Sequence, residues 1–456
     1  MQSVDPQSVQ AAALLKSSLP NDWPSVRLKF LLAAPITDGP HLTPEFTTEG
    51  FPFLSVDGIQ NGELVFEECR YVSEENHHEF SKKAAPQRDD ILLGKAASTG
   101  KIARVKVDTE FSIWSPLALI RADTRKVSSA FLEHCLKSTL LQSQIDDLCS
   151  SNTQKNISMG DIPRLTLPLP SLDVQLSIAN YLDRETARID GLIAEKQHML
   201  ALLEEKRAAL ISRVVTRGLD HNAPLKPSGQ EWLGDIPAHW EIWKLKYVVS
   251  KIGSGVTPRG GAESYQSEGI PLLRSQNIHF DGLRMDDVVF VDAEMHESME
   301  NSKVQDGDVL LNITGASIGR CFYIENMNGE VNVNQHVCIV RPSSQIQTKF
   351  LYFTLRSNIG QTQIDLSQSG SGREGLNFEA LGNFSMPVPS VNEQIAITEY
   401  LEATGQRSHL LLSEVRNSID RLKERRAALI TAAVTGQIPL NEMQNLTKEP
   451  SCASIV

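Results

Sequence analysis

The sequence predicts an α/β (α+β) protein, in which two mixed α/β domains in tandem are separated by two long helices. Two observations predict this class. Residues 168–216 recur as residues 387–435 without a gap, and Ser390 lies 219 residues after Ser171. A match of that length indicates an internal duplication. The short runs of Val, Ile and Leu that precede each copy, separated by Gly, Asn and Asp, predict mostly strands.

The repeat continues into the domains themselves. Residues 90–93 are echoed by 308–311, and we expect both on central strands. Residues 129–148 and 348–364 have helical spacing and predict helices near the end of each domain. In chain order we expect an N-terminal segment (1–19), a first mixed domain (20–168), a first long helix (169–217), a linker (218–235), a second mixed domain (236–387), a second long helix (388–440) and a disordered tail (441–456).

Both long helices have a predicted start. Ser171 and Ser390 stand at N-cap positions, and Glu393 completes a capping box with Ser390. An uninterrupted helix over 171–216 would be roughly 65 to 70 Å long. Two surface helices of one large core are the simpler alternative, although few globular helices reach this length.

Apolar residues recur along both helices at alternating steps of four and three, which is the spacing of a coiled-coil seam. Polar residues such as Lys196, Lys206 and Arg425 interrupt it. The predicted helix-packing residues are Leu192, Met199, Leu203 and Leu210 in the first copy and Leu411, Val415, Leu422 and Leu429 in the second.

Composition excludes several classes of protein. The chain has 456 residues, 41% of them hydrophobic, which is enough for two to four domains. Its six cysteines are scattered without metal-ligand spacing, which predicts reduced thiols, no metal and a cytoplasmic location. We find no signal peptide and no apolar segment long enough for a bilayer. The net charge of −12 argues against indiscriminate nucleic-acid binding but leaves room for a local basic groove.

Two motifs imitate catalytic loops. Residues 315–319 match a nucleophile elbow around Ser317, but a strand is predicted where the elbow needs a helix. Residues 94–102 imitate a phosphate loop with one residue too many between the glycines. We therefore predict a tight glycine turn between two strands in each case. His77-His78 lacks metal-ligand partners in the sequence and predicts a surface loop.

Both turns carry a basic residue directly after the second glycine. A basic side chain and free backbone N–H groups at such a turn suit a phosphate oxygen, although a merely solvated turn explains the pattern equally well. The candidate DNA-binding residues are Lys101 and Arg104 in the first domain and Arg259, Arg274, Gln276, Asn277, Arg320 and Arg373 in the second.

The repeated motifs resemble one known family. The opening Pro-x-Pro-Ser-x-x-x-Gln-x-x-Ile-x-x-Tyr-Leu and the close Arg-Ala-Ala-Leu-Ile-x-x-x-Val-Thr occur twice, and Trp232-Leu233-Gly234-Asp235-Ile236-Pro237-Ala238-His239-Trp240 leads into the second domain. These features resemble the specificity subunits of type I restriction-modification systems, from about residue 20 to 440. The first domain lacks the Trp-Leu-Gly lead-in of the second.

The resemblance implies two target recognition domains, each reading one half of a split double-stranded DNA site, and two antiparallel helices. These helices would carry methyltransferase subunits, two in number, and restriction subunits would join through the complex. It implies no catalysis and no cofactor in this chain, since the methyltransferase would use S-adenosylmethionine. We expect a bipartite, asymmetric site whose halves lie about 34 Å apart. The alternatives are a serine hydrolase using Ser317 and a coiled-coil adaptor that does not bind DNA.

Overall fold

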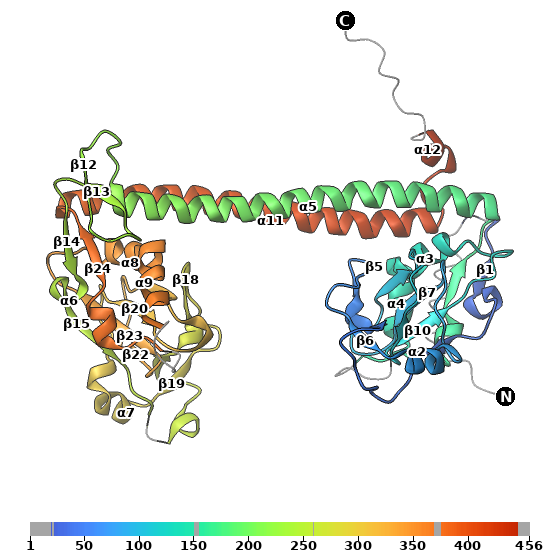
Figure 1. Ribbon diagram of the computed structural model, residues 1–456, viewed down its shortest axis with the longest axis horizontal. Helices are drawn as coiled ribbons and strands as arrows, with labels where there is room; N and C mark the ends of the chain where they lie inside the picture. The colour runs from blue at the N-terminus through green and yellow to red at the C-terminus, as the bar shows by residue number, and fades with distance from the viewer. Residues whose placement is uncertain (1–19, 21, 150–154, 259, 369–374, 446–456) are drawn as a thin grey trace, which may run out of the picture. The chain divides into compact units, whose positions relative to one another are not determined.

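The computed structural model describes residues 20, 22–149, 155–258, 260–368 and 375–445 (Figure 1). The chain divides into two compact units. The first unit comprises Met1–Lys196 and Asn417–Val456, and the second comprises Gln197–Arg416. Each unit therefore contains one mixed domain and part of each long helix. The N-terminal segment (1–19) and the residues Arg259 and Arg373 lie outside the described residues.

The two long helices are α5, Leu172–Arg217, and α11, Val391–Val434. Each begins directly after the serine that the sequence places at the N-cap. The backbone N–H of Glu393 donates to the Ser390 hydroxyl (3.4 Å), and this hydroxyl donates to the Glu393 carboxylate (3.1 Å). The bond to the Ser390 hydroxyl is the first half of the predicted capping box, but the Glu393 carboxylate accepts from this hydroxyl rather than from the Ser390 backbone N–H. Helix α11 is continuous from Val391 to Val434.

The first unit contains a four-stranded sheet of order β2-β10-β7-β8 and a three-stranded sheet of order β6-β3-β9, in which β3 and β9 are parallel. Two-stranded sheets join β1 to β11 and β4 to β5. The strands are β1 Ser25–Arg27, β2 Thr37–Asp38, β3 Phe51–Leu54, β4 Ile59–Gln60, β5 Glu63–Leu64, β6 Arg70–Val72, β7 Ile91–Gly94, β8 Ile102–Arg104, β9 Ser112–Ile113, β10 Leu117–Ile120 and β11 Thr166–Pro168.

The second unit repeats this arrangement strand for strand. Its four-stranded sheet has the order β15-β23-β20-β21, its three-stranded sheet β19-β16-β22, and its pairs are β14-β24 and β17-β18. An additional hairpin, β12-β13, runs from the expected linker into the start of the expected second domain. The strands are β12 Leu225–Pro227, β13 Asp235–Pro237, β14 Glu241–Lys244, β15 Val249–Ser254, β16 Ile270–Leu273, β17 Ile278–His279, β18 Gly282–Leu283, β19 Val289–Val291, β20 Val309–Asn312, β21 Cys321–Tyr323, β22 Asn332–Val333, β23 Val337–Pro342 and β24 Ser385–Val388.

The short helices also correspond between the units. The helical run expected near the end of each domain is two helices, broken at Ser138 and at Ser357. One helix of each pair packs against the sheet, α3 on β8 and α8 on β21. The helices are α2 Glu74–Ser81, α3 Ser129–Lys137, α4 Thr139–Asp147, α6 Leu245–Val248, α7 Ala293–Ser298, α8 Thr348–Arg356, α9 Asn358–Gln368, α10 Phe378–Gly382 and α12 Leu440–Asn445.

A buried glutamine attaches each long helix to its own domain. Gln175 accepts from the backbone N–H of Ser128 (2.8 Å) and donates to the carbonyl of Pro170 (2.8 Å). Gln394 does the same with the N–H of Gln347 (2.7 Å) and the carbonyl of Pro389 (3.0 Å). Both glutamines are fully buried. Satisfied buried amides of this kind orient the elements that they join.

The long helices pack antiparallel within each unit. In the first, residues 178–182 of α5 share a core with residues 430–434 of α11, and Asp190 pairs with Arg426 at 2.8 Å. In the second, residues 211–215 share a core with Ile397 and Leu401. Residue numbers therefore rise along one helix as they fall along the other, as expected.

The residues that the long helices bury against each other form a stripe, and every second residue of the predicted coiled-coil seam lies outside it. Leu192, Met199 and Leu411 were expected to pack, but they are 36%, 47% and 43% exposed, whereas Leu412 and Ile419 are buried. Residues 410–412 are all leucine, so the apolar repeat can begin at Leu411 or at Leu412. The structure buries the stripe that begins at Leu412. The predicted residues that lie on the stripe are Val415, which is buried, and Leu203, Leu210, Leu422 and Leu429, which are half-buried.

Two further expectations are wrong. His77 and His78 lie in α2 rather than in a loop, because Ser73 caps this helix and the His77 ring stacks on Phe51 at 3.9 Å. Leu440–Asn445 forms α12, although the sequence predicted a disordered tail from residue 441, and Met443 is buried in the core of the first unit. Residues 446–456 lie outside the described residues.

Candidate nucleic-acid interface

The two glycine motifs are turns between antiparallel strands, as predicted. The first joins β7 to β8, with Gly100 at φ +89°, and the second joins β20 to β21, with Gly319 at φ +85°. These positive φ angles favour glycine over residues with a side chain. A strand follows Ser317 where an elbow needs a helix, and the hydroxyl of Ser317 accepts from the Asn312 amide (3.1 Å). The hydrolase alternative therefore lacks its local geometry.

A glutamine holds each turn against a helix. Gln142 donates to the carbonyls of Gly100 (3.0 Å) and Leu136 (2.7 Å). Gln361, 219 residues later, donates to the carbonyls of Gly319 (3.1 Å) and Leu355 (2.9 Å). We did not predict this clamp. The recurrence of glutamine at the repeat offset is the sequence signal that could have revealed it.

Lys101 and Arg320 occupy equivalent positions after these turns. Both side chains are half-buried, and neither makes a hydrogen bond or ion pair to another described residue. Their backbone N–H groups are already bonded inside the turns, to Ser98 (3.5 Å) and Ser317 (3.1 Å). A phosphate contact at these turns would therefore depend on the side-chain cation rather than on those two amides. Their contact with DNA stays a prediction.

Arg104 is engaged within the first unit. Its guanidinium donates to Glu133 (3.0 Å) and Asp89 (2.8 Å), and its side chain is 16% exposed. Burial works to lower the pKa of Arg104, but the hydrogen bonds to Glu133 and Asp89 outweigh it and raise the pKa. The structure thus gives Arg104 a structural role, and its proposed DNA contact is untested.

The three candidates around the short turn at residues 274–277 have different environments. Arg274 donates to the backbone carbonyl of Asp287 (2.7 Å), and its guanidinium lies 5.9 Å from the Tyr265 ring. Gln276 is exposed and donates to the Asp287 carboxylate. Asn277 is fully buried, since its amide bridges the backbone of Arg274 and Arg284. Gln276 is therefore the accessible member of this group.

The same short turn exists in the first unit with different side chains. Residues 55–58 correspond to 274–277, and both form a single turn of 3-10 helix. Asp57 stands exposed where the second unit has Gln276. A carboxylate only accepts hydrogen bonds, whereas an amide donates and accepts, so that each suits a different base edge. The repeat thus presents two chemistries on one backbone frame.

A buried ion pair supports the central strand of each sheet. The Asp90 carboxylate receives two hydrogen bonds from Arg121, at 2.8 and 2.6 Å, and Asp308 receives two from Arg341, at 2.7 and 2.9 Å. In both cases the hydrogen bond to the aspartate raises the pKa of the arginine.

The described part of the chain contains five free cysteines and no helix that could cross a membrane.

Comparison with known proteins agrees with the repeat. A family model described as type I restriction modification DNA specificity domain matches residues 20–199 and 237–421. The chain is 22% identical over 405 residues to the type I restriction enzyme EcoKI specificity subunit of Escherichia coli K12, covering 85% of this chain and 82% of that one. It is 27% identical over 328 residues to the EcoBI specificity subunit of Escherichia coli, covering 70% and 68%.

A solved structure shares the fold. It comes from work on the structural basis of complex assembly and conformational transition of the type I R-M system, and it matches with a TM-score of 0.70 at 18% identity. The match covers 92% of this chain and 99% of that chain. The duplicated arrangement of mixed domains and long helices is therefore a known architecture.

Proposed function

We propose, from the premise that this chain belongs to the type I restriction modification DNA specificity family, that its domains read the two unlike halves of a bipartite DNA site. Family membership makes DNA sequence recognition the function of the chain. The finer statements, on the form of the site and on the partners, rest on the repeat. Neither the hydrolase nor the DNA-free adaptor gains support from the comparisons.

The equivalent turns at residues 55–58 and 274–277 carry this proposal. Their backbones correspond, but their exposed side chains are Asp57 and Gln276. Because discrimination between base pairs depends on donors and acceptors at the base edge, like frames with unlike side chains suit two unlike half-sites. We therefore expect an asymmetric site with an unread spacer.

Domain exchange tests this form of the site. Replacing residues 20–168 with the corresponding domain of a relative should change one half-site and leave the other intact. Methylated positions in the host genome, mapped by sequencing, are the measurement. An exchange that altered both halves, or a continuous palindromic site, would contradict the proposal. Inserting one heptad in α5 between Thr186 and Leu203 should change the spacer alone.

Exposed apolar side chains on the long helices support docking of two methyltransferase subunits. Leu172 and Leu176 are exposed on α5, and their equivalents Val391 and Ile395 are exposed on α11. Exposed apolar groups that recur in both copies indicate a surface used twice. Restriction subunits would join through the same complex.

Replacing Leu176 or Ile395 with aspartate should remove one methyltransferase subunit, and the double variant should remove both. Native mass spectrometry of the reconstituted complex measures the stoichiometry. Gln197→Asp, an exposed change 21 residues further along the same helix, is the control and should leave assembly unchanged. Full assembly by the double variant would exclude this surface.

We also propose that the chain is not catalytic and uses no cofactor for methylation. The methyl donor, S-adenosylmethionine, would be bound by the methyltransferase partner. The purified chain should neither methylate nor cut DNA, and methylation should appear when the methyltransferase subunit is added. Methyl transfer by the chain alone would contradict this assignment.

A further inference from the structure

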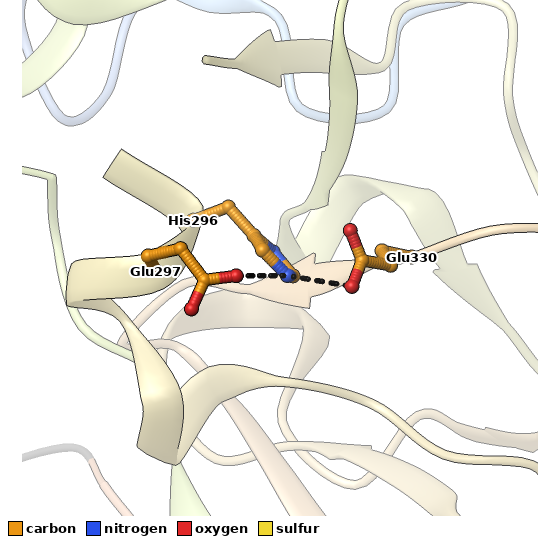
Figure 2. A group of neighbouring side chains, drawn as sticks. All are labelled: His296, Glu297 and Glu330. Carbon is orange, nitrogen blue, oxygen red and sulfur yellow. Dashed lines mark ion pairs between the residues drawn. The ribbon is translucent and has the colours of Figure 1, made fainter. Parts of the chain in front are cut away.

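Three side chains of the second unit converge from different places in the sequence. His296 and Glu297 belong to α7, and Glu330 precedes β22 (Figure 2). The Nε2 atom of His296 lies 3.3 Å from Glu330 Oε1 and 4.0 Å from Glu297 Oε1. One possible ligand atom from each residue lies within 4.8 Å of the others. The histidine is 2% exposed, whereas both glutamates are mostly exposed.

A buried hydrogen-bond chain determines the tautomer of His296. The Ser302 hydroxyl donates to the carbonyl of Met299 (2.7 Å), so its oxygen is left to accept from the Asn332 amide (2.7 Å). This turns Asn332 Oδ1 toward His296 Nδ1, at 2.5 Å. Because a carboxamide oxygen only accepts, Nδ1 carries the hydrogen and Nε2 presents its lone pair.

That lone pair has no hydrogen-bond partner, since Nε2 is buried and unpaired in the described structure. It faces the carboxylate oxygens of Glu297 and Glu330, which are acceptors as well. Acceptors that face one another are unfavourable unless a cation lies between them. A proton or a metal ion would meet this requirement.

We propose that His296, Glu297 and Glu330 bind a divalent transition-metal ion, with Zn²⁺ the best fit. Imidazole nitrogen and carboxylate oxygen are common Zn²⁺ ligands at about 2.0–2.1 Å, so tetrahedral ligand atoms lie roughly 3.3 Å apart. The separation of His296 from Glu330 already has this value. Glu297 must approach by about 0.7 Å, which its exposed side chain permits.

The second-shell contacts favour the same ligand. A metal-bound histidine usually donates its other ring N–H to an oxygen, which sets the ring orientation and increases its basicity. Asn332 supplies that oxygen here. A neighbouring cation, Lys303, contacts Glu297 at 3.3 Å, but through Oε2, whereas Oε1 faces the histidine. The lysine and the metal ion therefore use different oxygens of one carboxylate.

The fourth coordination position would open to solvent. His296 and Glu330 line a cavity of about 710 Å³, together with Lys251, Lys303 and Arg341. The cavity leaves room for water as the remaining ligand. The ion would link α7 to the segment before β22, and so stabilise one edge of the three-stranded sheet.

The first unit provides an internal control. His77 corresponds to His296, and its Nε2 lies 3.6 Å from Glu110. Its Nδ1 meets the Ser112 hydroxyl (2.9 Å), which can donate or accept and leaves the tautomer open. His78 stands where the second unit has Glu297. The described residues of the first unit contain no matching group of three ligands.

The test uses the full chain, stripped with a chelator and titrated with Zn²⁺ alone. We expect one ion per chain by calorimetry and elemental analysis, and a raised melting temperature. Glu330→Gln and Glu297→Gln change exposed side chains and should each weaken Zn²⁺ binding at least about tenfold. His77→Ala, the matched control, should bind as the wild type does. Co²⁺ should give visible absorption that Glu330→Gln weakens at the same Co²⁺ concentration.

Three binding results would overturn the proposal. They are the absence of Zn²⁺ binding at micromolar concentration, undiminished binding by both glutamate variants, and binding that is lost in His77→Ala. Nitrogen NMR separates a metal ion from a proton, because Zn²⁺ must shift the Nε2 signal of His296. A His296 ring protonated on both nitrogens and unchanged by Zn²⁺ would assign the cation as a proton.

Discussion

The joint between domain and long helix has different chemistry in the two units. In the first, Arg104, Glu133 and Lys137 form an ion cluster beside Asp183 of α5. The corresponding residues of the second unit are Tyr323, Tyr352, Arg356 and Glu402. There the Tyr323 and Tyr352 rings pack at 5.1 Å, and burial raises the pKa of Tyr352 to about 12.

The contact between the two long helices also differs between the units. Asp190 pairs with Arg426 in the first unit, but in the second the equivalent positions hold His409 and Arg207. Burial and the nearby charge of Arg356 lower the pKa of Arg207. The arginine lines a cavity of about 590 Å³ together with aromatic side chains.

The backbone frame and the glutamine clamps are the same in both units, so neither depends on the chemistry of the joint. A buried ion cluster and an aromatic cluster are two physical solutions to one packing problem. They should respond differently to substitution and to pH.

The largest expected effect concerns Glu133, which accepts from both Arg104 and Lys137 and is 1% exposed. Glu133→Ala leaves two buried cations without this partner and should lower the free energy of unfolding by about 3–5 kcal/mol. The triple variant Arg104→Tyr, Glu133→Tyr, Lys137→Arg copies the second unit and should recover most of the loss. Urea unfolding of the full chain measures both. A triple variant as unstable as Glu133→Ala would show that the joints are not interchangeable.

The joint of the first unit should lose stability at acid pH, and the joint of the second unit should lose stability at alkaline pH. Burial works to raise the pKa of Glu133, but the charge and hydrogen bond of Lys137, the charge of Lys106 and the hydrogen bond from Arg104 outweigh it and lower the pKa. A lowered carboxyl pKa contributes stability that is present above pH 4.5 and lost as the pH falls through the folded value. The raised pKa of Tyr352 contributes stability that is lost as the pH rises from 10 to about 12.

The alkaline loss should amount to about 2–3 kcal/mol, and Tyr352→Phe should reduce it. The acid loss should shrink in the triple variant of the first unit. Urea midpoints measured between pH 3 and pH 12 provide the comparison. A Tyr352→Phe profile that matched the wild type above pH 10 would exclude this tyrosine as the source.

A smaller loss of stability is expected at the glutamine clamps, and it should be the same in both units because the clamps make the same hydrogen bonds. Gln142→Ala and Gln361→Ala each remove two hydrogen bonds to backbone carbonyls. Each should lower the free energy of unfolding by about 1–2 kcal/mol. Circular dichroism during urea unfolding measures it. Losses that differed strongly between the two variants would show that the turns are not held alike.

The smallest effect on stability is expected at Lys101 and Arg320, since neither side chain has a partner among the described residues. Alanine at either position should leave the unfolding midpoint unchanged. If each contacts a phosphate, the slope of log affinity against log salt should fall by about one unit per substitution. Fluorescence anisotropy with the assembled complex measures it. An unchanged slope would remove that residue from the interface.

Local patterns in the sequence determined much of the fold. The offset between the repeats identified two copies, and the runs around Leu92 and Leu310 marked the central strands. Ser171 and Ser390 marked the helix starts. These features follow from residues close together in the chain, where capping, turn geometry and hydrophobic spacing act directly.

Tertiary structure decided the phase of the helix packing. Leu411 and Leu412 fit the repeat almost equally well, and only contact between the helices buries one and exposes the other. It also decided that Asn277 is buried while Gln276 is exposed, because the backbone of Arg284 folds back over one side of the turn.

The convergence of His296, Glu297 and Glu330 was equally unpredictable. No local sequence spacing connects α7 to the segment before β22. The sequence around His77-His78 did not indicate that His296, the equivalent of His77, would face two carboxylates. Sequence patterns report neighbours along the chain, whereas ion clusters, tautomers and buried partners depend on distances through space. Those distances exist only once the sheets have paired and the helices have packed.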